Sequence, residues 1–238
     1  CEHRFNSEFG FQSFPEPEVA RTRHAQLARI RQRAMDPAGL AGLWTARTLY
    51  AAGEPYARSA LGDAERVAKI GRDAVRGFAE ARYRPAGAAL VVAGDVDPSE
   101  VRGLADRVFA GWTGGEGAPS PPTGAPAAEA LRVVVVDRPG AVQSEIRVGH
   151  VGAPRSIADH ADLVVGNAVL GGTFGSRLNL NLRERNGFTY GVRARWDFRR
   201  GPGPFVVSTA VDTGVTADAV REIVGELDRM HAEGPTAP

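Results

Sequence analysis

The sequence is poor in cysteine, in lysine and in long apolar runs. Cys1 is the one cysteine among 238 residues, which excludes a disulfide within the chain. No apolar run approaches the roughly 20 residues that a membrane-spanning helix needs. Of the 29 basic residues only Lys69 is a lysine, and the arginines are interleaved with acidic residues, so that the net charge is +1. This balance gives no reason to expect a nucleic acid or an anionic membrane as a partner.

Histidines are also few, and none is placed for metal binding. The sequence contains His3, His24, His150, His160 and His231, with no pair at His-x-x-Glu-His spacing in either direction. Cys1-Glu2-His3 matches only the end of such a motif, because the leading histidine is absent. His150 has no acid or cysteine at ligand spacing, which favours a structural role. The sequence therefore predicts no metal site in this chain.

The rest of the composition is that of a globular protein with two folded regions. A hydrophobic content of 43% and a charged content of 24% are ordinary for such a protein. Residues 113–130 are rich in glycine and proline, which predicts a semi-rigid linker. We therefore expect a first domain over residues 1–112 and a second over 131–238. The sequence begins without methionine, so we expect a fragment or a processed product, and the compartment stays open between periplasm and cytoplasm.

Hydrophobic patterns predict helices and strands in both regions. Helices are expected over about residues 14–35, 38–51, 73–82, 97–112 and 176–185, from Ser156 or Asp159, and from Thr216. Strands are expected over Ala88–Ala93, Leu131–Val136, Gln143–Val151, Tyr190–Phe198 and Phe205–Val211. This mixture predicts an α+β fold with a mixed or antiparallel sheet and helices packed on one face.

One stretch, GGTFGSRLNLNLRERNGFTYGV over residues 171–192, organises the second region. Its first glycines permit close approaches of the backbone, and Asn186-Gly187 ends a short helix. Arg183 and Tyr190 lie seven residues apart across the turn that follows. A guanidinium and a phenol held together can donate hydrogen bonds to one developing oxyanion. From spacing alone, an equally good interpretation makes Arg183 a surface residue and Tyr190 a core aromatic of the next strand.

GGTFGSRL followed by LRERNGFTY closely resembles the glycine-rich loop and the Arg…Tyr pair of the pitrilysin/insulinase/mitochondrial processing peptidase family of inverse-zincin metallopeptidases. The resemblance extends from about Phe14 to Glu233. It implies two consecutive partial domains of the LuxS/processing-peptidase-like metallohydrolase type. Catalytic members place a glutamate ligand late in the first helix, where this sequence has Arg29, and a cation cannot ligate zinc.

The resemblance implies that the chain is the substrate-binding, non-zinc portion or subunit of a zinc-dependent metalloendopeptidase that cleaves peptides or unfolded proteins in a closed chamber. Arg183 and Tyr190 would stabilise the carbonyl oxygen of the peptide. The substrate would be bound by Gly171, Gly172, Thr173 and Phe174. Zinc would be held by a partner subunit or domain of the same family, and the chain alone would be inactive. The alternative is a proteolytically inactive scaffold or peptide-binding homologue.

The glycines of GGTFGS also allow a phosphate-binding interpretation, since they precede the N-terminus of a helix. The segment lacks the Lys-Ser/Thr ending of a P-loop and the spacing of a dinucleotide-binding fingerprint. Binding of phosphate is therefore the weaker hypothesis for this loop.

Overall fold

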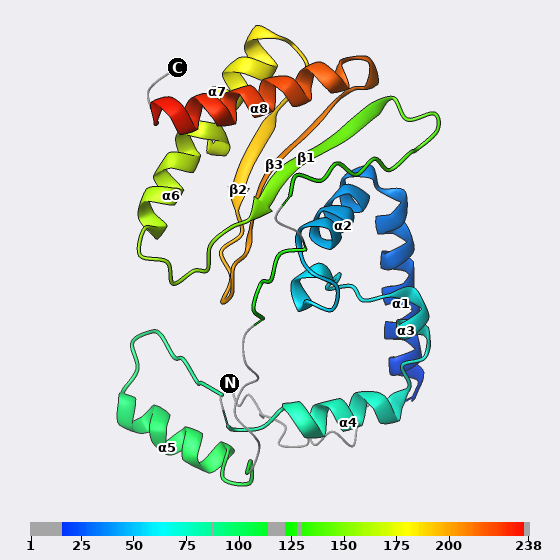
Figure 1. Ribbon diagram of the computed structural model, residues 1–238. Coiled ribbons are helices and arrows are strands. Elements are labelled where there is room, and N and C mark those ends of the chain that lie inside the picture. Colours follow the sequence, from blue (N-terminus) through cyan, green and yellow to red (C-terminus); the bar gives the residue numbers. More distant parts are fainter. Residues whose placement is uncertain (1–15, 87, 114–121, 128–129, 236–238) are drawn as a thin grey trace. The chain divides into compact units, whose positions relative to one another are not determined.

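The computed structural model describes residues 16–86, 88–113, 122–127 and 130–235 (Figure 1). The chain divides into two compact units. One consists of Cys1–Arg31 and Leu61–Ser120, and the other of Gln32–Ala60 and Pro121–Pro238. The domain boundaries expected from the sequence stay a prediction.

The second unit is built on a three-stranded antiparallel sheet with the strand order β1-β3-β2. Its strands are β1 (Gln143–Val151), β2 (Val192–Trp196) and β3 (Pro204–Asp212). Along the central strand β3 every second residue from Phe205 to Val211 is buried, which is the period expected of a strand with one covered face. The predictions of β1 and β3 are confirmed. β2 is shorter than predicted, because Tyr190 lies in the loop before it.

Helical segments cover one face of this sheet (Figure 1). They are α6 (His160–Asn167), the π-helical turn η3 (Ala168–Gly172), α7 (Arg177–Asn179), the π-helical turn η4 (Leu180–Arg185) and α8 (Thr216–Glu233). Leu178, Leu182 and Ile223 are fully buried against the strands. The predicted α+β architecture, with an antiparallel sheet and helices on one face, is confirmed in this unit.

Helix α2 (Pro37–Leu49) packs against β1 in the same unit. Asp36 begins the helix, and its carboxylate accepts a hydrogen bond of 2.8 Å from the backbone of Gly39. Directly after α2, the buried side chain of Tyr50 donates a hydrogen bond of 3.0 Å to the carbonyl oxygen of Pro202. The short 3-10 helix η2 (Pro55–Ala57) follows. The hydrogen bond from Tyr50 attaches the α2 segment to the hairpin between β2 and β3.

The first unit contains most of α1 (Glu16–Met35), together with α3 (Ala64–Ala68), α4 (Arg72–Arg82) and α5 (Pro98–Val108). The predictions of α1, α4 and α5 are confirmed in type, whereas α3 was not predicted. Asp97 caps α5, as its position before Pro98 predicts, and accepts hydrogen bonds of 2.7 Å and 3.1 Å from two backbone amides. The hydrogen bond from the Ser99 hydroxyl and those from the amides lower the pKa of Asp97.

Two predicted strands are wrong. Neither Ala88–Ala93 nor Leu131–Val136 has regular secondary structure, and neither is paired with another described strand. Val91 is 86% exposed and Val135 is 85% exposed, so neither run is buried. An apolar pattern shows that a segment favours a sheet, but a strand also needs hydrogen-bonded neighbours, and the described part of the chain supplies none to these runs.

Candidate functional site

The site predicted from the sequence begins where η3 passes closely over β2. Gly171 is buried there, and a Cβ atom added to it would lie 2.6 Å from the Cβ and 2.8 Å from the backbone nitrogen of Ala194. Because the backbone of a paired strand cannot easily yield, this position requires glycine. The next three residues, Gly172, Thr173 and Phe174, turn out to the surface.

Asn179 ties this loop to the strand that follows the site. Its buried amide Nδ2 donates to the carbonyl oxygens of Thr173 at 3.0 Å and of Val192 at 2.9 Å, and to the hydroxyl of Ser176 at 3.1 Å. Its Oδ1 accepts a hydrogen bond of 3.1 Å from the backbone N–H of Val192. The two N–H groups of Nδ2 are shared among these three acceptors, so one side chain contacts four polar groups and fixes the loop relative to the start of β2.

Arg183 lies between two aromatic rings at the surface. Its guanidinium carbon is 4.0 Å from the ring centre of Phe174 and 5.0 Å from that of Tyr190. Its Nε lies 3.3 Å from a carboxylate oxygen of Glu184, in a partly exposed ion pair. Tyr190 is 90% exposed and Phe174 is 67% exposed. The structure thus brings the predicted Arg–Tyr pair together beside the glycine loop, and it does not place Tyr190 in the core.

Tyr190 points outwards because hydrogen bonds fix the residues on either side of it, Thr189 and Gly191. The hydroxyl of Thr209 on β3 lies 2.8 Å from the hydroxyl of Thr189 and donates to the carbonyl oxygen of Gly191 at 3.0 Å. The Thr189 hydroxyl also accepts a hydrogen bond from the N–H of Gly191. Because the residues on both sides of this turn are hydrogen-bonded, only the side chain of Tyr190 between them is free to face solvent.

A buried ionic network holds the helical segment that carries Arg183. The guanidinium of Arg177 lies 3.2 Å from a carboxylate oxygen of Glu226 on α8. Glu226 also accepts hydrogen bonds of 2.8 Å from Asn181 and 2.7 Å from Arg229. Burial alone would raise the pKa of Glu226, but these three hydrogen bonds outweigh it and the pKa is lowered. The carboxylate is therefore held in its charged form as part of the fold.

Sequence reasoning missed the residues that position the site, Asn179, Thr209 and the Arg177–Glu226 pair. A signal for Asn179 and Asn181 was present. Asparagine is a poor residue for a helix interior, so two asparagines inside the leucine-rich run LNLNL indicate specific buried hydrogen bonds. Thr209 and Glu226 gave no such signal, because their partners lie far away in the sequence.

The described residues do not provide a zinc site. Among them, no group of three or more histidine, cysteine, aspartate or glutamate side chains is close enough to hold a metal ion. His150 instead contacts the rings of Trp196 and Phe205, as expected of a structural residue. Arg29 is exposed on α1. Cys1-Glu2-His3 lies outside the described residues.

Phosphate binding at the glycine loop is disfavoured by burial. The first helical residues after the loop, Ser176 to Asn179, are all buried, so their backbone amides do not face solvent.

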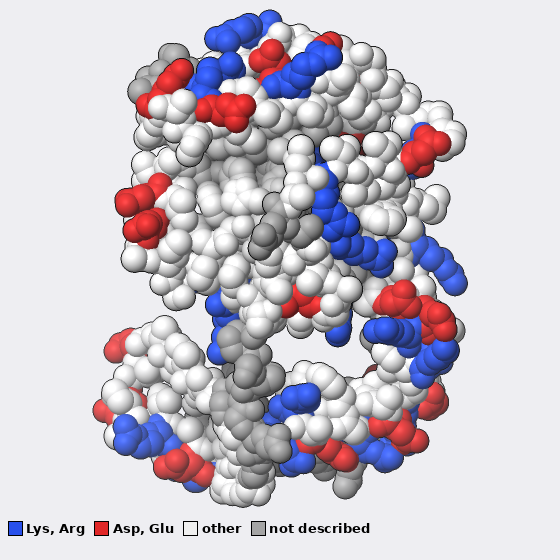
Figure 2. Space-filling view, in the orientation of Figure 1, with Lys and Arg blue, Asp and Glu red and all other residues white. Residues whose placement is uncertain are grey.

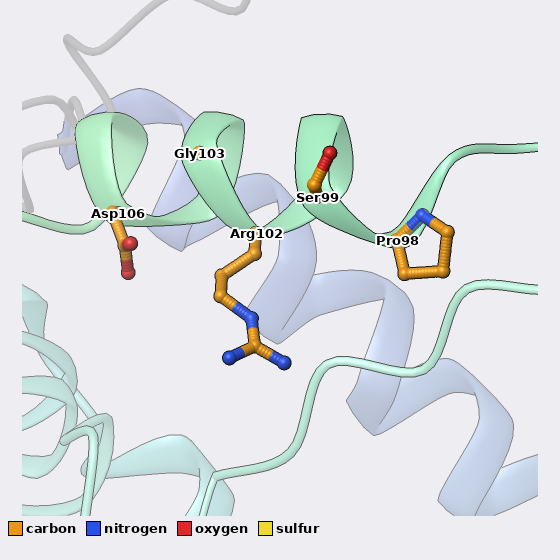
Figure 3. Close-up of a pocket in the computed structure, with 5 residues that line it drawn as sticks. All are labelled: Pro98, Ser99, Arg102, Gly103 and Asp106. Atoms are coloured by element: carbon orange, nitrogen blue, oxygen red, sulfur yellow. The ribbon is translucent and has the colours of Figure 1, made fainter.

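A separate surface depression follows one side of α5 in the other unit (Figure 3). It is lined by Pro98, Ser99, Arg102, Gly103 and Asp106. All five residues belong to one helix, and the depression shares none with the predicted site.

Charges of both signs are interspersed over α8, at the top of Figure 2. They belong in part to exposed i,i+3 ion pairs such as Arg221–Asp218. No described helix is both long and apolar enough to cross a membrane.

The glycine loop, the Arg183–Tyr190 pair and the α+β fold together define a peptidase-like domain. The family model of the peptidase M16 inactive domain matches residues 69–237. The chain belongs to this family, which confirms the resemblance carried by GGTFGSRL and LRERNGFTY.

Similar proteins are about twice as long as this chain. It is 27% identical to an uncharacterised zinc protease of Mycobacterium leprae over 226 residues, which are 92% of this chain and 49% of that protein. Two solved structures have the same fold. A peptidase M16 inactive domain from Pseudomonas fluorescens matches with 24% identity and a TM-score of 0.77, over 94% of this chain and 54% of its own. A protease from Helicobacter pylori matches with 20% identity and a TM-score of 0.81, over 91% and 53%.

Proposed function

We propose that this chain is the substrate-binding, non-zinc portion of a zinc-dependent metalloendopeptidase, in which Arg183 and Tyr190 donate hydrogen bonds to the peptide carbonyl oxygen. The observation that carries the proposal is the position of the Arg183 guanidinium, 5.0 Å from the ring centre of a Tyr190 that is exposed to solvent. An arginine has five N–H donors and a tyrosine has one O–H donor, so the two side chains can donate hydrogen bonds to the same oxygen from two directions.

The chemistry follows from the charge that develops during peptide hydrolysis. When a nucleophile adds to the carbonyl carbon, the oxygen gains negative charge, and donors that are already in place stabilise it. The stacking of Arg183 on Phe174 restricts the guanidinium before substrate arrives, which reduces the entropy lost in the transition state. Gly172 and Thr173 are exposed and directly precede Phe174, so they can contact the substrate chain.

In this proposal zinc is held by a zinc-bearing subunit or domain of the same family, since the described residues offer no ligand set for it. When bound there, the metal supplies an activated water. The two portions would enclose a chamber that admits peptides or unfolded proteins. This chain would contribute the wall that carries the glycine loop and the donor pair.

The test is peptide cleavage by this chain together with a zinc-bearing companion that co-purifies with it, measured with a quenched fluorescent peptide. Arg183→Ala is expected to lower kcat by about 10²- to 10³-fold, the usual effect of losing one oxyanion donor. Tyr190→Phe should lower kcat too, because only the hydroxyl is removed. Arg185→Ala, which removes an exposed arginine two residues further on, is the control and should leave turnover unchanged. Full turnover in both site variants would refute the proposed role.

A scaffold or peptide-binding role without proteolysis is the second candidate, and it is favoured by the description of the matching family as an inactive domain. The two candidates differ in what Arg183→Ala changes. In a scaffold, the substitution would weaken retention of a peptide, and no companion would restore cleavage. In the peptidase, it would reduce kcat far more than it changes KM.

A further inference from the structure

Two arginines of β2 lie on the face of the sheet that is opposite to the helical layer. Val192 and Ala194 are buried under the helices. Arg193 and Arg195 alternate with them along the strand, so both guanidinium groups lie on the other face. Both side chains are exposed, and neither has a hydrogen bond, an ion pair or a ring contact with a described residue. Two neighbouring cations without a described counter-charge favour an anionic partner.

The charge in the same row of the sheet is already balanced on the other edge strand, β1. Arg193 lies opposite Ser208 on β3, and this row continues to Arg147 on β1. The guanidinium of Arg147 is 2.8 Å from a carboxylate oxygen of Glu145, and both side chains are half-buried. The charges of Arg193 and Arg195 are therefore the ones that remain available to a ligand on this face.

The outer edge of β2 is closed by side chains, so a peptide cannot join the sheet there as a further strand. Asn179 occupies both backbone groups of Val192. The Nδ2 of Asn167 donates a hydrogen bond of 3.0 Å to the carbonyl oxygen of Ala194. On the same edge, a Cβ added to Gly171 would lie only 2.8 Å from the nitrogen of Ala194. A peptide beside β2 is therefore contacted through its side chains rather than through its backbone.

We propose that Arg193 and Arg195 select peptide substrates that carry acidic residues at two alternate positions, Glu-x-Glu or Asp-x-Asp. The inference rests on the proposed function, because that function places a peptide at the Arg183–Tyr190 pair. Side chains two residues apart are about 6.6 Å apart along β2 and along an extended peptide, so two carboxylates can meet the two guanidinium groups. At most about 11 Å of chain separates Tyr190 from Arg193, which puts the acidic residues roughly three to five positions from the cleaved bond.

Other anionic partners fit this face less well. Nucleic acids and anionic membranes are bound by larger fields of positive charge, and this chain has a net charge of only +1. An acidic patch on the zinc-bearing subunit would also pair with the two arginines. In that case their loss would weaken assembly of the two subunits rather than change the choice of peptide.

The experiment uses this chain together with its zinc-bearing companion and three fluorescent peptides that differ only at two alternate positions, Glu-x-Glu, Gln-x-Gln or Lys-x-Lys. KM is measured by cleavage, and Kd is measured after zinc has been chelated, so that the peptides stay intact. At low salt the Glu-x-Glu peptide is expected to have a KM and a Kd about 10-fold lower than the Gln-x-Gln peptide, the effect of two exposed ion pairs. High salt should remove the difference.

The variant Arg193→Gln/Arg195→Gln should also remove the difference and leave kcat for the Gln-x-Gln peptide unchanged. Arg138→Gln/Arg155→Gln is the matched control, because it removes two other exposed arginines of the same unit and changes the net charge equally. It should keep the preference for Glu-x-Glu. Arg193→Glu/Arg195→Glu should reverse the preference, so that the Lys-x-Lys peptide binds best.

Each other result would overturn the proposal. A preference for Glu-x-Glu that survives in Arg193→Gln/Arg195→Gln would place the acid-binding site elsewhere, and equal binding of all three peptides would show that substrate charge is not recognised. Loss of the companion from this variant would assign the face to the contact between subunits. Displacement of the Glu-x-Glu peptide by inorganic phosphate as readily as by the unlabelled peptide would show a simple anion site. Because Kd is measured without turnover, an unchanged kcat in Arg183→Ala would refute the proposed function without affecting this test.

Discussion

The side chain of Asn179 binds both backbone groups of Val192, accepting from its N–H at 3.1 Å and donating to its carbonyl oxygen at 2.9 Å. A strand neighbour would make the same pair of bonds. The side chain of Asn179 thus takes the place of a neighbouring strand at the beginning of β2. It also donates a hydrogen bond to the glycine loop, at the carbonyl oxygen of Thr173. The relative position of Phe174 on the loop and Tyr190 before the strand depends on this side chain.

Substitution of Asn179 should therefore destabilise the second unit. Asn179→Ala leaves two buried polar groups without the partner seen here, the N–H and the carbonyl oxygen of Val192, and is expected to lower the free energy of unfolding by about 2 to 4 kcal/mol. Asn179→Asp keeps the acceptor for Val192 N–H but loses every donated bond, so it should be nearly as damaging. Urea unfolding followed by circular dichroism measures both.

The control for these variants is Thr173→Ala, which removes one long hydrogen bond of 3.3 Å from an exposed hydroxyl. It should cost less than about 1 kcal/mol. If Asn179→Ala were no more damaging than this control, Asn179 would not hold the loop and the strand together.

The sequence was sufficient for the elements whose pattern is local. The period of β3 and the cap of α5 at Asp97 depend on residues close in sequence, and both were predicted correctly. The glycine loop was also recognised, because Gly171 is required by a close backbone approach and the surrounding motif is specific. The proximity of Arg183 and Tyr190 was implied by the family resemblance, because spacing alone equally allowed Tyr190 to lie in the core.

The failures have one physical cause, which is dependence on distant partners. Ala88–Ala93 has the apolar composition of a buried strand, yet strand formation requires neighbours that the described chain lacks. Likewise Glu226 was indistinguishable from an exposed helical glutamate, because Arg177 and Asn181 meet it across a sequence separation of more than 40 residues. Composition alone does not reveal such long-range pairing.

Gly171 and Gly175 give a matched test of the loop packing. Gly171→Ala forces a Cβ against Ala194 of β2 and is expected to destabilise the unit by about 1 to 3 kcal/mol. At Gly175 nothing lies within 4 Å of an added Cβ, so Gly175→Ala should be tolerated. Thermal unfolding of the two variants provides the comparison. Equal stability would contradict the close approach of η3 to β2.

The lowered pKa of Glu226 predicts how the second unit responds to acid. The unfolded carboxyl titrates at its ordinary value near 4.5 and the folded one below it, so the carboxylate stabilises the fold above that value. This stabilisation is lost as the pH falls through the folded pKa, since both states are then protonated. Glu226→Gln should therefore differ most from wild type at neutral pH and approach it in acid. Urea unfolding from neutral pH to pH 3 measures the difference.

The matched control for Glu226→Gln is Glu65→Gln, which removes one partner of the exposed i,i+4 ion pair with Lys69. Exposed pairs of this kind contribute about 0 to 1 kcal/mol. The control should therefore remain close to wild type at neutral pH. A loss as large as that of Glu226→Gln would show that removal of any glutamate, rather than of the buried network, destabilises the chain.

Tyr50 predicts the opposite response, at alkaline pH. Burial is the main cause that raises its pKa from 10.0 to about 12. Between these two values the unfolded phenol loses its proton and the folded one keeps it, so the contribution to stability is complete below pH 10 and is lost as the pH rises through 12. A shift of this size corresponds to about 2 to 3 kcal/mol. Titration of phenolate absorbance should show a step near pH 12.

Tyr50→Phe should remove that step and, at neutral pH, lower the free energy of unfolding by about 1 kcal/mol, because the hydrogen bond to the carbonyl oxygen of Pro202 is lost. Tyr190→Phe removes an exposed phenol instead and should leave the step near pH 12 in place. If the step survived in Tyr50→Phe, the phenol that resists ionisation would be another tyrosine. The attachment of the α2 segment to the β2–β3 hairpin would then not depend on a buried neutral Tyr50.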